Sequence, residues 1–453
     1  MKKLTFSELF AIGIGFTLGS AVFSLTGVCA MYTGGSTFLA YIIGAVVIFI
    51  LMLPTTIAGS IVPRQGVSYS LSKEAITPAI GGFWIWIFLI GRIMLLANIT
   101  AFAIYFTSVF TTLNPNAVAG CILIIFFVAN LFGLKTAAKV QKIMNAIMFL
   151  SYGIFIIFGI GKLNTIFVFN SDAFLSGGMM GFYTAVSTVM LAMSGGMSLV
   201  ELGNSVDNPE RNLPKACALI TLVAGLLFAG IGIATVGALP LIPMSEGGAS
   251  MAGTLLFKGP SSSVINAAEA IFANQPPLLY MFIFGGACLA TATTINGSFS
   301  LYAAPIQAAI KDGWFPKWFG KTNKHGTPYR IESIFVIGCI VSLLVIDPAN
   351  IGSVNTDIVK AGMNLHILDV LIPNLGLLSV PKLYPEVWQK SKWHMSKGVL
   401  NAFVGIITVI FLYLWYINFV QLAPMIKTAV IIGLAIGVVY TIVGSKTFAK
   451  PKN

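Results

Sequence analysis

The stretch GIGFTLGSAVFSLTG, residues Gly13–Gly27, decides how this chain folds. It is apolar enough to enter a membrane, yet four of its fifteen residues are glycine. Each glycine inside a helix costs about 1 kcal/mol relative to alanine, so this segment is poorly suited to one continuous helix. A second apolar segment, residues 187–216, has the same character, with Gly195 and Gly196 near its middle. We therefore expect both segments to be interrupted halfway along.

Interrupted helices in a membrane have a chemical consequence. Where the coil is lost at mid-depth, backbone N–H and C=O groups are freed, and they are tolerated only when buried in protein or facing a cavity. Free N–H groups at the start of a half-helix suit a carboxylate, and free carbonyls suit an ammonium group or a cation. Two such segments in matching positions are typical of transporters built from inverted repeats. The alternative is that the glycines only permit close packing of helices.

The composition places most of the chain in lipid. The 453 residues are 57% hydrophobic and only 9% charged, more apolar surface than a soluble protein of this length can bury. Because helices satisfy their own backbone hydrogen bonds, the recurring apolar stretches predict an all-α polytopic membrane protein of about 12 transmembrane helices. We place them near residues 8–31, 38–62, 80–110, 117–134, 140–161, 181–203, 216–239, 277–307, 332–346, 361–380, 398–420 and 424–444.

The formal net charge of +12 is a topology signal. With the N-terminus inside and twelve spans, 21 of the 26 Lys and Arg residues fall on the inner side and four on the outer side. This bias predicts that both termini are cytoplasmic and that the protein lies in the cell (cytoplasmic) membrane. No nucleic-acid motif accompanies the charge, so no nucleic-acid partner is expected; the oligomeric state stays open.

The residue types that carry catalysis or hold metals are sparse. The five cysteines lie in or beside apolar runs without CxxC spacing, and none of the three histidines is near a cysteine cluster. No Ser/His/Asp or Cys/His set is visible. We expect no enzyme activity, no catalytic residues, no metal site and no cofactor.

Several motifs together resemble the amino acid–polyamine–organocation (APC) transporter superfamily. Residues 13–23 are similar to its G-x-G-x-x-x-G-S-G-I-F signature, and residues 208–214 to its N-P-x-R-x-x-P motif. Residues 310–316, followed by Thr327 and Pro328, resemble A-R-D-G-x-x-P…T-P, and Thr294-Ile-Asn296 resembles a small-residue–x–Asn element. The order and spacing of these motifs cover about residues 6–330; the remainder agrees by helix count.

The resemblance implies the fold of the bacterial leucine transporter, a 5+5 inverted repeat with discontinuous helices 1 and 6. The whole chain, 1–453, would be a single transporter domain. Repeat one would cover about 8–161, repeat two about 181–380, and two additional helices about 398–444. The implied activity is secondary transport of an amino acid or amino-acid-like solute by alternating access, as symporter or exchanger. Alternatives are a polyamine or amine exchanger and a solute receptor that does not transport.

In that fold the substrate carboxylate rests on the first unwound region, which here would be Gly19, Ser20 and Ala21. The amino group would face carbonyls of the second break, for which the candidates are Leu191, Ala192, Gly195 and Gly196. The sequence departs from the family in having Ala21 where glycine is usual. It also lacks an aromatic gate before the glycine pair, which implies either a roomier pocket or a gate supplied from elsewhere, such as Phe299 or Phe23.

Arg92 is the one basic residue within an apolar segment, IFLIGRIMLLAN. A buried arginine is costly and usually marks a pathway or a partner. One hypothesis is that its planar guanidinium binds an anionic group of the substrate. The other is a structural pair with Glu201 or Asp369, or a substitute for the coupling lysine that relatives have in segment five.

The driving ion, H⁺ or Na⁺, is open from the sequence. Glu201 is a candidate proton carrier, and Thr293, Thr294 and Ser298 offer hydroxyls where sodium-coupled relatives of this fold hold their ion. The threonine and serine hydroxyls would otherwise bond to carbonyls of their own helix. His366 and Asp369, three residues apart, would form a polar pair on one helix face.

Overall fold

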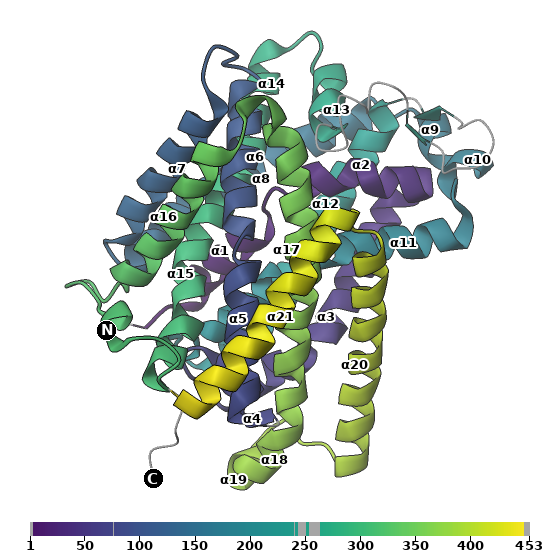
Figure 1. Ribbon diagram of the computed structural model, residues 1–453. Coiled ribbons are helices and arrows are strands. Elements are labelled where there is room, and N and C mark those ends of the chain that lie inside the picture. Colours follow the sequence, from purple (N-terminus) through teal and green to yellow (C-terminus); the bar gives the residue numbers. More distant parts are fainter. Residues whose placement is uncertain (1–2, 76, 240, 243–250, 253–262, 448–453) are drawn as a thin grey trace.

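The computed structural model describes residues 3–75, 77–239, 241–242, 251–252 and 263–447 (Figure 1). The regular secondary structure of these residues is helical apart from a two-residue antiparallel pair, β1 (Leu241–Ile242) with β2 (Met251–Ala252), and two isolated bridges, Leu4 with Val206 and Gln65 with Leu202. The helices of the first half are α1 (Phe6–Thr17), α2 (Ala21–Thr33), α3 (Thr37–Ile61), α4 (Val67–Ala75), α5 (Pro78–Gly91), α6 (Met94–Thr107), α7 (Pro115–Asn130), α8 (Leu134–Gly161), α9 (Thr165–Phe169) and α10 (Ser171–Phe174). Those of the second half are α11 (Gly178–Met190), α12 (Pro209–Ala238), α13 (Ser263–Ile271), α14 (Pro276–Met281), α15 (Leu289–Lys311), α16 (Tyr329–Val345), α17 (Ile351–Leu375), α18 (Val380–Leu383), α19 (Pro385–Lys390), α20 (Lys397–Val420) and α21 (Pro424–Thr447).

Nine helices among the described residues are long and apolar enough to cross a membrane, which agrees with a polytopic membrane protein. Every predicted segment coincides with helix, but α7 and α16 have only 16 and 17 residues. At 1.5 Å per residue such helices are about 25 Å long, short of the roughly 30 Å hydrocarbon core. The exact number of spans, about twelve by sequence, stays a prediction.

The first apolar segment is interrupted as its glycines predict. α1 begins with a capping box, in which Thr5 accepts from the Glu8 amide and Glu8 accepts from the Thr5 amide. It ends at Thr17, and α2 starts only at Ala21. Leu18 leaves the helical conformation (ψ 41°), so α1 does not continue into α2. The first backbone N–H groups of α2 therefore have no preceding helical turn whose carbonyl oxygens could accept their hydrogen bonds.

A sharp turn joins α2 to α3. Gly34 adopts φ +63°, a conformation that favours glycine, and a Cβ there would lie 2.2 Å from the Ala173 carbonyl oxygen. At Gly35 a Cβ would lie 1.9 Å from the Val168 carbonyl oxygen. The two glycines thus let the α9–α10 segment pack directly on this turn.

The second glycine-containing segment also departs from α-helical geometry halfway. α11 gives way at Met190 to η2, a 3₁₀ helix over Leu191–Glu201. Runs of 3₁₀ helix longer than four residues are uncommon and often mark a functional site. Gly195 lies against α1, because a Cβ added there would be 2.9 Å from the Thr17 Cα. The two interruptions therefore face each other.

The third segment differs from the single apolar helix predicted for residues 80–110. α5 ends at Gly91 and α6 begins at Met94, with Arg92 and Ile93 in a turn between them. The Arg92 Nε–H donates to the Phe88 carbonyl oxygen at 3.0 Å. A third interruption thus lies at the buried arginine, for which the sequence offers only a glycine next to a charge.

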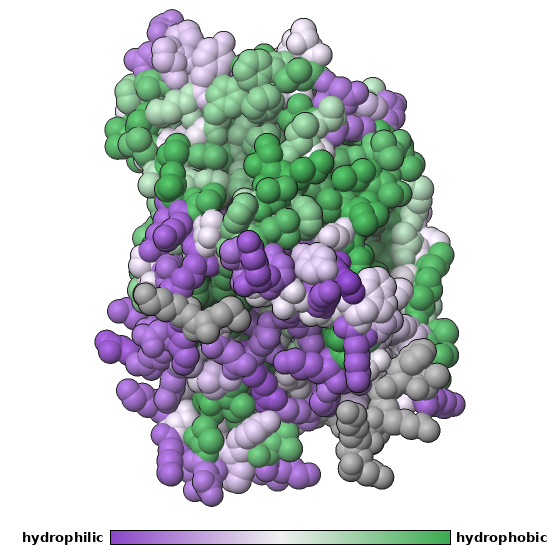
Figure 2. Space-filling model, turned by 90° about the vertical axis from the view of Figure 1, so that its left-hand side faces the viewer, coloured by the Kyte–Doolittle hydropathy of each residue, from purple (hydrophilic) through white to green (hydrophobic). Residues whose placement is uncertain are grey.

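In Figure 1, α1 lies in the middle of the bundle, α2 and α11 extend toward its right-hand edge, and α20 and α21 lie on its outside. The described part of the chain begins and ends in the lower half of this view, and α9, α10, α13 and α14 lie in its upper part. Figure 2 shows one face with hydrophobic residues over the upper half and hydrophilic residues over the lower half. Such a division fits a protein with its apolar part in lipid and a polar end in water.

Candidate functional site

A cavity of about 110 Å³ lies where the three interruptions meet. The predicted binding residues that line it are Gly19, Ser20, Ala21, Arg92, Leu191, Ala192 and Gly195. Gly196 is not among the lining residues of the described chain; its α-carbon faces Ile220 of α12, 2.7 Å from where a Cβ would stand. Seven of the eight predicted residues are therefore brought together.

At the first interruption, backbone atoms and the hydroxyl group of Ser20 line the cavity. Ser20 Oγ donates to Asn98 Oδ1 at 3.2 Å, and Asn98 Nδ2 donates to the Met94 carbonyl oxygen at 2.7 Å. A Cβ at Gly19 would lie 2.4 Å from Thr294 Oγ1 of α15. The chain therefore passes close to α15 at Gly19. Ala21, the first residue of α2, lies in the wall of the cavity.

The second interruption presents a hydroxyl that contacts two partners. Ser194 Oγ lies 2.7 Å from the Leu191 carbonyl oxygen and 2.9 Å from His366 Nε2. Both Ser194 and His366 line the cavity. The 3₁₀ segment is thus connected by one hydrogen bond to α17.

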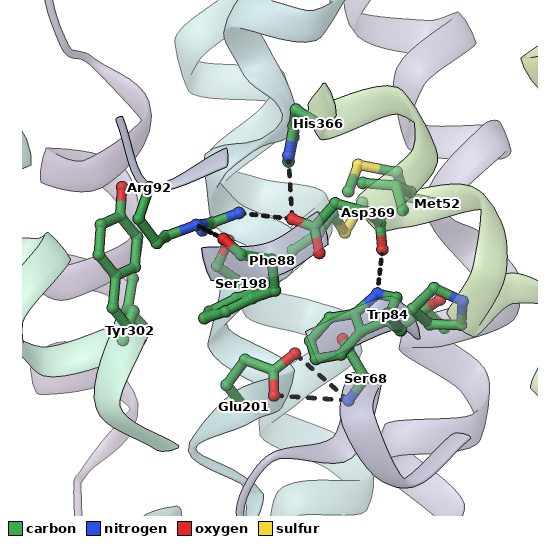
Figure 3. Close-up of a pocket in the computed structure, with 15 residues that line it drawn as sticks. Met52, Ser68, Trp84, Phe88, Arg92, Ser198, Glu201, Tyr302, His366 and Asp369 are labelled. Carbon is green, nitrogen blue, oxygen red and sulfur yellow. Dashed lines mark hydrogen bonds and ion pairs between the residues drawn. The ribbon is translucent and has the colours of Figure 1, made fainter. Parts of the chain in front are cut away.

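Arg92 is paired with Asp369, one of the two partners considered from the sequence (Figure 3). Arg92 Nη2 lies 2.6 Å from Asp369 Oδ2, and the two side chains are each 9% exposed. The guanidinium stacks on the rings of Phe88 and Tyr302, with centroids 4.0 and 4.6 Å away. Such contacts further stabilise a buried cation.

Asp369 has three contacts and one unfilled acceptor. His366 Nδ1 lies 3.4 Å from the same Oδ2, and Trp84 Nε1 donates to the Asp369 carbonyl oxygen at 2.7 Å. Asp369 Oδ1 is buried without a hydrogen-bond partner among the described residues. The predicted His366–Asp369 pair on one helix face is therefore present, and it continues to Arg92.

Glu201 lies at a second, smaller cavity of about 40 Å³ on the far side of this charge cluster. Both of its carboxylate oxygens lie 3.3–3.4 Å from the Ser68 backbone amide, which donates to them (Figure 3). Arg92, Ser198, Tyr302 and His366 line both cavities, so the two adjoin. Arg92 has its ion pair with Asp369, not with Glu201.

The hydroxyls considered for sodium are directed mainly to their own helix. Thr293 Oγ1 donates to the Ala290 carbonyl oxygen at 2.8 Å, and Ser298 Oγ to that of Thr294 at 2.8 Å. Thr294 Oγ1 lies 3.1 Å from the Ala290 carbonyl oxygen and 3.5 Å from that of Gly15. In the described part of the chain no group of three or more His, Cys, Asp or Glu residues could hold a metal ion. A role for these hydroxyls in coupling stays a prediction.

The rings at the cavity are not those expected from the sequence. Phe299 packs on Phe127, and Phe23 belongs to a cluster with Tyr105, Tyr152 and Phe282. Neither Phe299 nor Phe23 is among the lining residues, which include Phe16 and Tyr302 instead. These two rings meet edge to face at 6.0 Å. The sequence did not indicate them because their convergence depends on how α1 and α15 cross.

A wider cavity of about 460 Å³ adjoins the site on the α2 side. It is lined by α2, the first half of α17 and the end of α20, and it shares Met363 with the central cavity. Lys360 is the one charged residue on its wall in the described chain. This wider cavity is thus a neighbour of the central one on the side where α2 lies.

Asn98, Ser194, Tyr302 and Met363 are lining residues that sequence reasoning missed. Asn98 and Ser194 carried a signal, since each is a polar residue within an apolar segment and close to an interruption. Tyr302 and Met363 carried none. These features define a helical membrane protein whose interrupted helices meet at a central cavity lined by both apolar and polar residues.

A family model described as amino acid permease matches residues 4–444. The chain belongs to this family, and it is therefore a membrane transporter rather than an enzyme. The APC resemblance read from the motifs is confirmed.

Among the relatives, the serine/threonine exchanger SteT of Bacillus subtilis is 27% identical over 260 residues, 54% of this chain and 57% of its own length. The aspartate-proton symporter of the same organism is 25% identical over 263 residues, 54% of this chain and 50% of its own length. The branched-chain amino acid permease BcaP of Lactococcus lactis is 24% identical over 351 residues, 72% of each chain. The family and these relatives support transport of an amino acid across a membrane.

Proposed function

We propose that this protein is a secondary active transporter that binds one small amino acid between the interruptions at residues 18–20 and 191–201. The substrate carboxylate would rest on the opening amides of α2, at Gly19, Ser20 and Ala21, and the ammonium group on the carbonyls of Leu191 and Ala192. The observation that carries this proposal is that both interruptions and Arg92 line one cavity.

We further propose a substrate with no net charge. The positive charge of Arg92 is balanced by Asp369 at 2.6 Å, so the cavity does not require an additional anionic group from the substrate. Two of the relatives described above carry serine and threonine or branched-chain amino acids by name. Arg92 would then shape the pocket through its stacked guanidinium, with Phe16 and Tyr302 closing over the substrate.

We also propose the architecture that the motifs imply. The whole chain would form a single transporter domain of twelve spans, with repeats at about 8–161 and 181–380 in opposite orientations and two further helices at about 398–444. Matching interruptions in the first span of each repeat support this arrangement. Alternating access would then move one group of helices against the other around the fixed site.

Uptake into proteoliposomes tests the proposed function. Labelled L-serine, L-leucine and L-aspartate are offered separately, with and without unlabelled amino acid inside, and under imposed proton or sodium gradients. We expect saturable uptake of serine or leucine that exceeds uptake of aspartate. Binding without accumulation or counterflow in every condition would contradict transport and would favour a receptor.

The orientation of the chain gives a second prediction. With both termini cytoplasmic, Lys324 lies inside and Lys360 outside; both side chains are exposed. In a Cys121→Ser background, which removes the exposed native cysteine, an impermeant maleimide should label Lys360→Cys in intact cells. It should label Lys324→Cys only in inverted vesicles. The reverse pattern would contradict the orientation.

A further inference from the structure

The contacts of Ser194 and His366 limit where the hydroxyl hydrogen and the imidazole hydrogens can lie. A serine hydroxyl has one hydrogen to donate, and each imidazole nitrogen either carries a hydrogen or accepts one. Ser194 Oγ lies within hydrogen-bond distance of both the Leu191 carbonyl oxygen and His366 Nε2. A carbonyl oxygen can only accept a hydrogen bond. The direction in which the Ser194 hydroxyl donates therefore determines whether His366 Nε2 carries a hydrogen.

Two arrangements satisfy these contacts. In the first, Ser194 donates to the Leu191 carbonyl, so His366 must donate through Nε2 to Ser194. Its other nitrogen, Nδ1, faces the Asp369 carboxylate at 3.4 Å and also carries a hydrogen, so the ring is a cation. In the second, Ser194 donates to a bare Nε2, the ring is neutral, and the Leu191 carbonyl loses the hydroxyl hydrogen bond.

The charged and titratable neighbours favour His366 as the group that exchanges the proton. Asp369 is held as a carboxylate by Arg92 at 2.6 Å, and both are only 9% exposed. The His366 side chain is 25% exposed and lines the cavity. The remaining groups facing this space are Tyr302 on α15 and Glu201 on η2, which share the adjoining cavity with His366. Glu201 is only 5% exposed, accepts from the Ser68 amide and is not among the residues that line the central cavity.

We propose that His366 is a proton-binding site linked to substrate binding through Ser194. This inference rests on the proposed function, because it needs the substrate ammonium group at the Leu191 carbonyl. When the ammonium group takes that carbonyl, Ser194 turns its hydrogen to Nε2, and the Nε2 proton leaves to water in the cavity. The ammonium group takes the place of the proton, so the two positive charges never lie side by side; because the substrate also brings its carboxylate, the net charge of the site falls by one.

The linkage has a definite sign. Substrate and proton compete, so binding one amino acid releases up to one proton from His366. On acidification the dissociation constant should therefore rise, by up to about tenfold per pH unit for the exchange of one proton. Transport through this site would exchange an amino acid for a proton.

The test measures proton release and affinity together. Purified full-length protein in a weakly buffered solution with a pH dye is titrated with L-serine, L-leucine and L-aspartate in turn. The dissociation constant of the tightest of these probes is then measured at several pH values. We expect proton release on binding and the stated pH slope in the wild-type protein.

Two variants locate the effect. His366→Gln cannot titrate, so proton release and the pH slope should both be lost. Ser194→Ala keeps the imidazole but cuts its connection to Leu191, so the slope should also fall, a result that a merely structural histidine would not give. The matched control is His325→Gln, an exposed histidine on the loop before α16, which should keep the wild-type slope.

The outcomes separate this inference from the proposed function. A wild-type slope and proton release in both His366→Gln and Ser194→Ala would overturn the inference, as would proton uptake on binding. Binding by the wild-type protein that is independent of pH would also overturn it and leave the proposed function intact. If none of the three probes binds at any pH, the proposed function itself fails.

Discussion

Replacing Arg92 with methionine is expected to destabilise the protein by about 3–5 kcal/mol, because the buried Asp369 carboxylate then loses its cation. His366 Nδ1 at 3.4 Å is then the remaining ionisable partner of the carboxylate, and Asp369 Oδ1 lacks a hydrogen-bond partner among the described residues, so the shortest ion-pair contact of the charge is not replaced. The measurement is the melting temperature of the purified protein in detergent. Asp369→Leu should be similarly harmful, since it leaves the guanidinium unpaired.

The double variant Arg92→Met/Asp369→Leu distinguishes structure from transport. Replacing both charges by apolar groups of similar size should restore most of the stability, because no charge is left buried alone. Amino acid uptake should stay low if the guanidinium also shapes the pocket. The control is Lys73→Met, which breaks a pair with Asp312 whose side chains are 37% and 32% exposed. It should cost no more than about 1 kcal/mol. Single Arg92 variants that melt like the wild-type protein would contradict a stabilising ion pair.

Gly195→Ala is expected to reduce amino acid uptake by roughly tenfold or more while the protein still reaches the membrane. The added Cβ would lie 2.9 Å from the Thr17 Cα, so the two interruptions must separate. Overpacking of this kind costs about 1–3 kcal/mol, and 1.4 kcal/mol corresponds to a factor of ten in binding. Initial rates of labelled amino acid uptake, normalised to protein in the membrane, give the measurement.

A matched glycine provides the control for that prediction. Gly153 of α8 has no described atom within 4 Å of the position that its Cβ would take. Gly153→Ala should therefore leave uptake unchanged and, through its better helix propensity, leave stability equal or slightly higher. Equal uptake in the Gly195 and Gly153 variants would show that close approach at Gly195 is not needed.

The interruptions of the first and sixth segments could be predicted because their cause is local. Glycine weakens a helix wherever it occurs, and a pair of weakened helices in matching positions already implies a common site. The break at Arg92 was missed because only one glycine precedes it, and a charge in an apolar run does not reveal whether the backbone unwinds.

The pairing of Arg92 could not be decided from sequence for a different reason. Glu201 and Asp369 are both acidic residues in apolar segments, and the choice between them depends on the rotation and depth of η2 and α17 around the cavity. The contact between Ser194 and His366 spans 172 residues and depends on the same crossing. Neither residue type signals a partner at that distance along the chain, so a three-dimensional arrangement was required.

The eleven-residue 3₁₀ stretch has a mechanical consequence. A 3₁₀ helix rises about 2.0 Å per residue and an α-helix about 1.5 Å, so recoiling this stretch would shorten it by about 5 Å. This change in length is close to the rise of one α-helical turn. It would come from a change in helix type alone, with the backbone covalently intact. A change of this segment between the two helical forms would therefore let it lengthen or shorten as its neighbours move, while it keeps the position proposed for the substrate ammonium group.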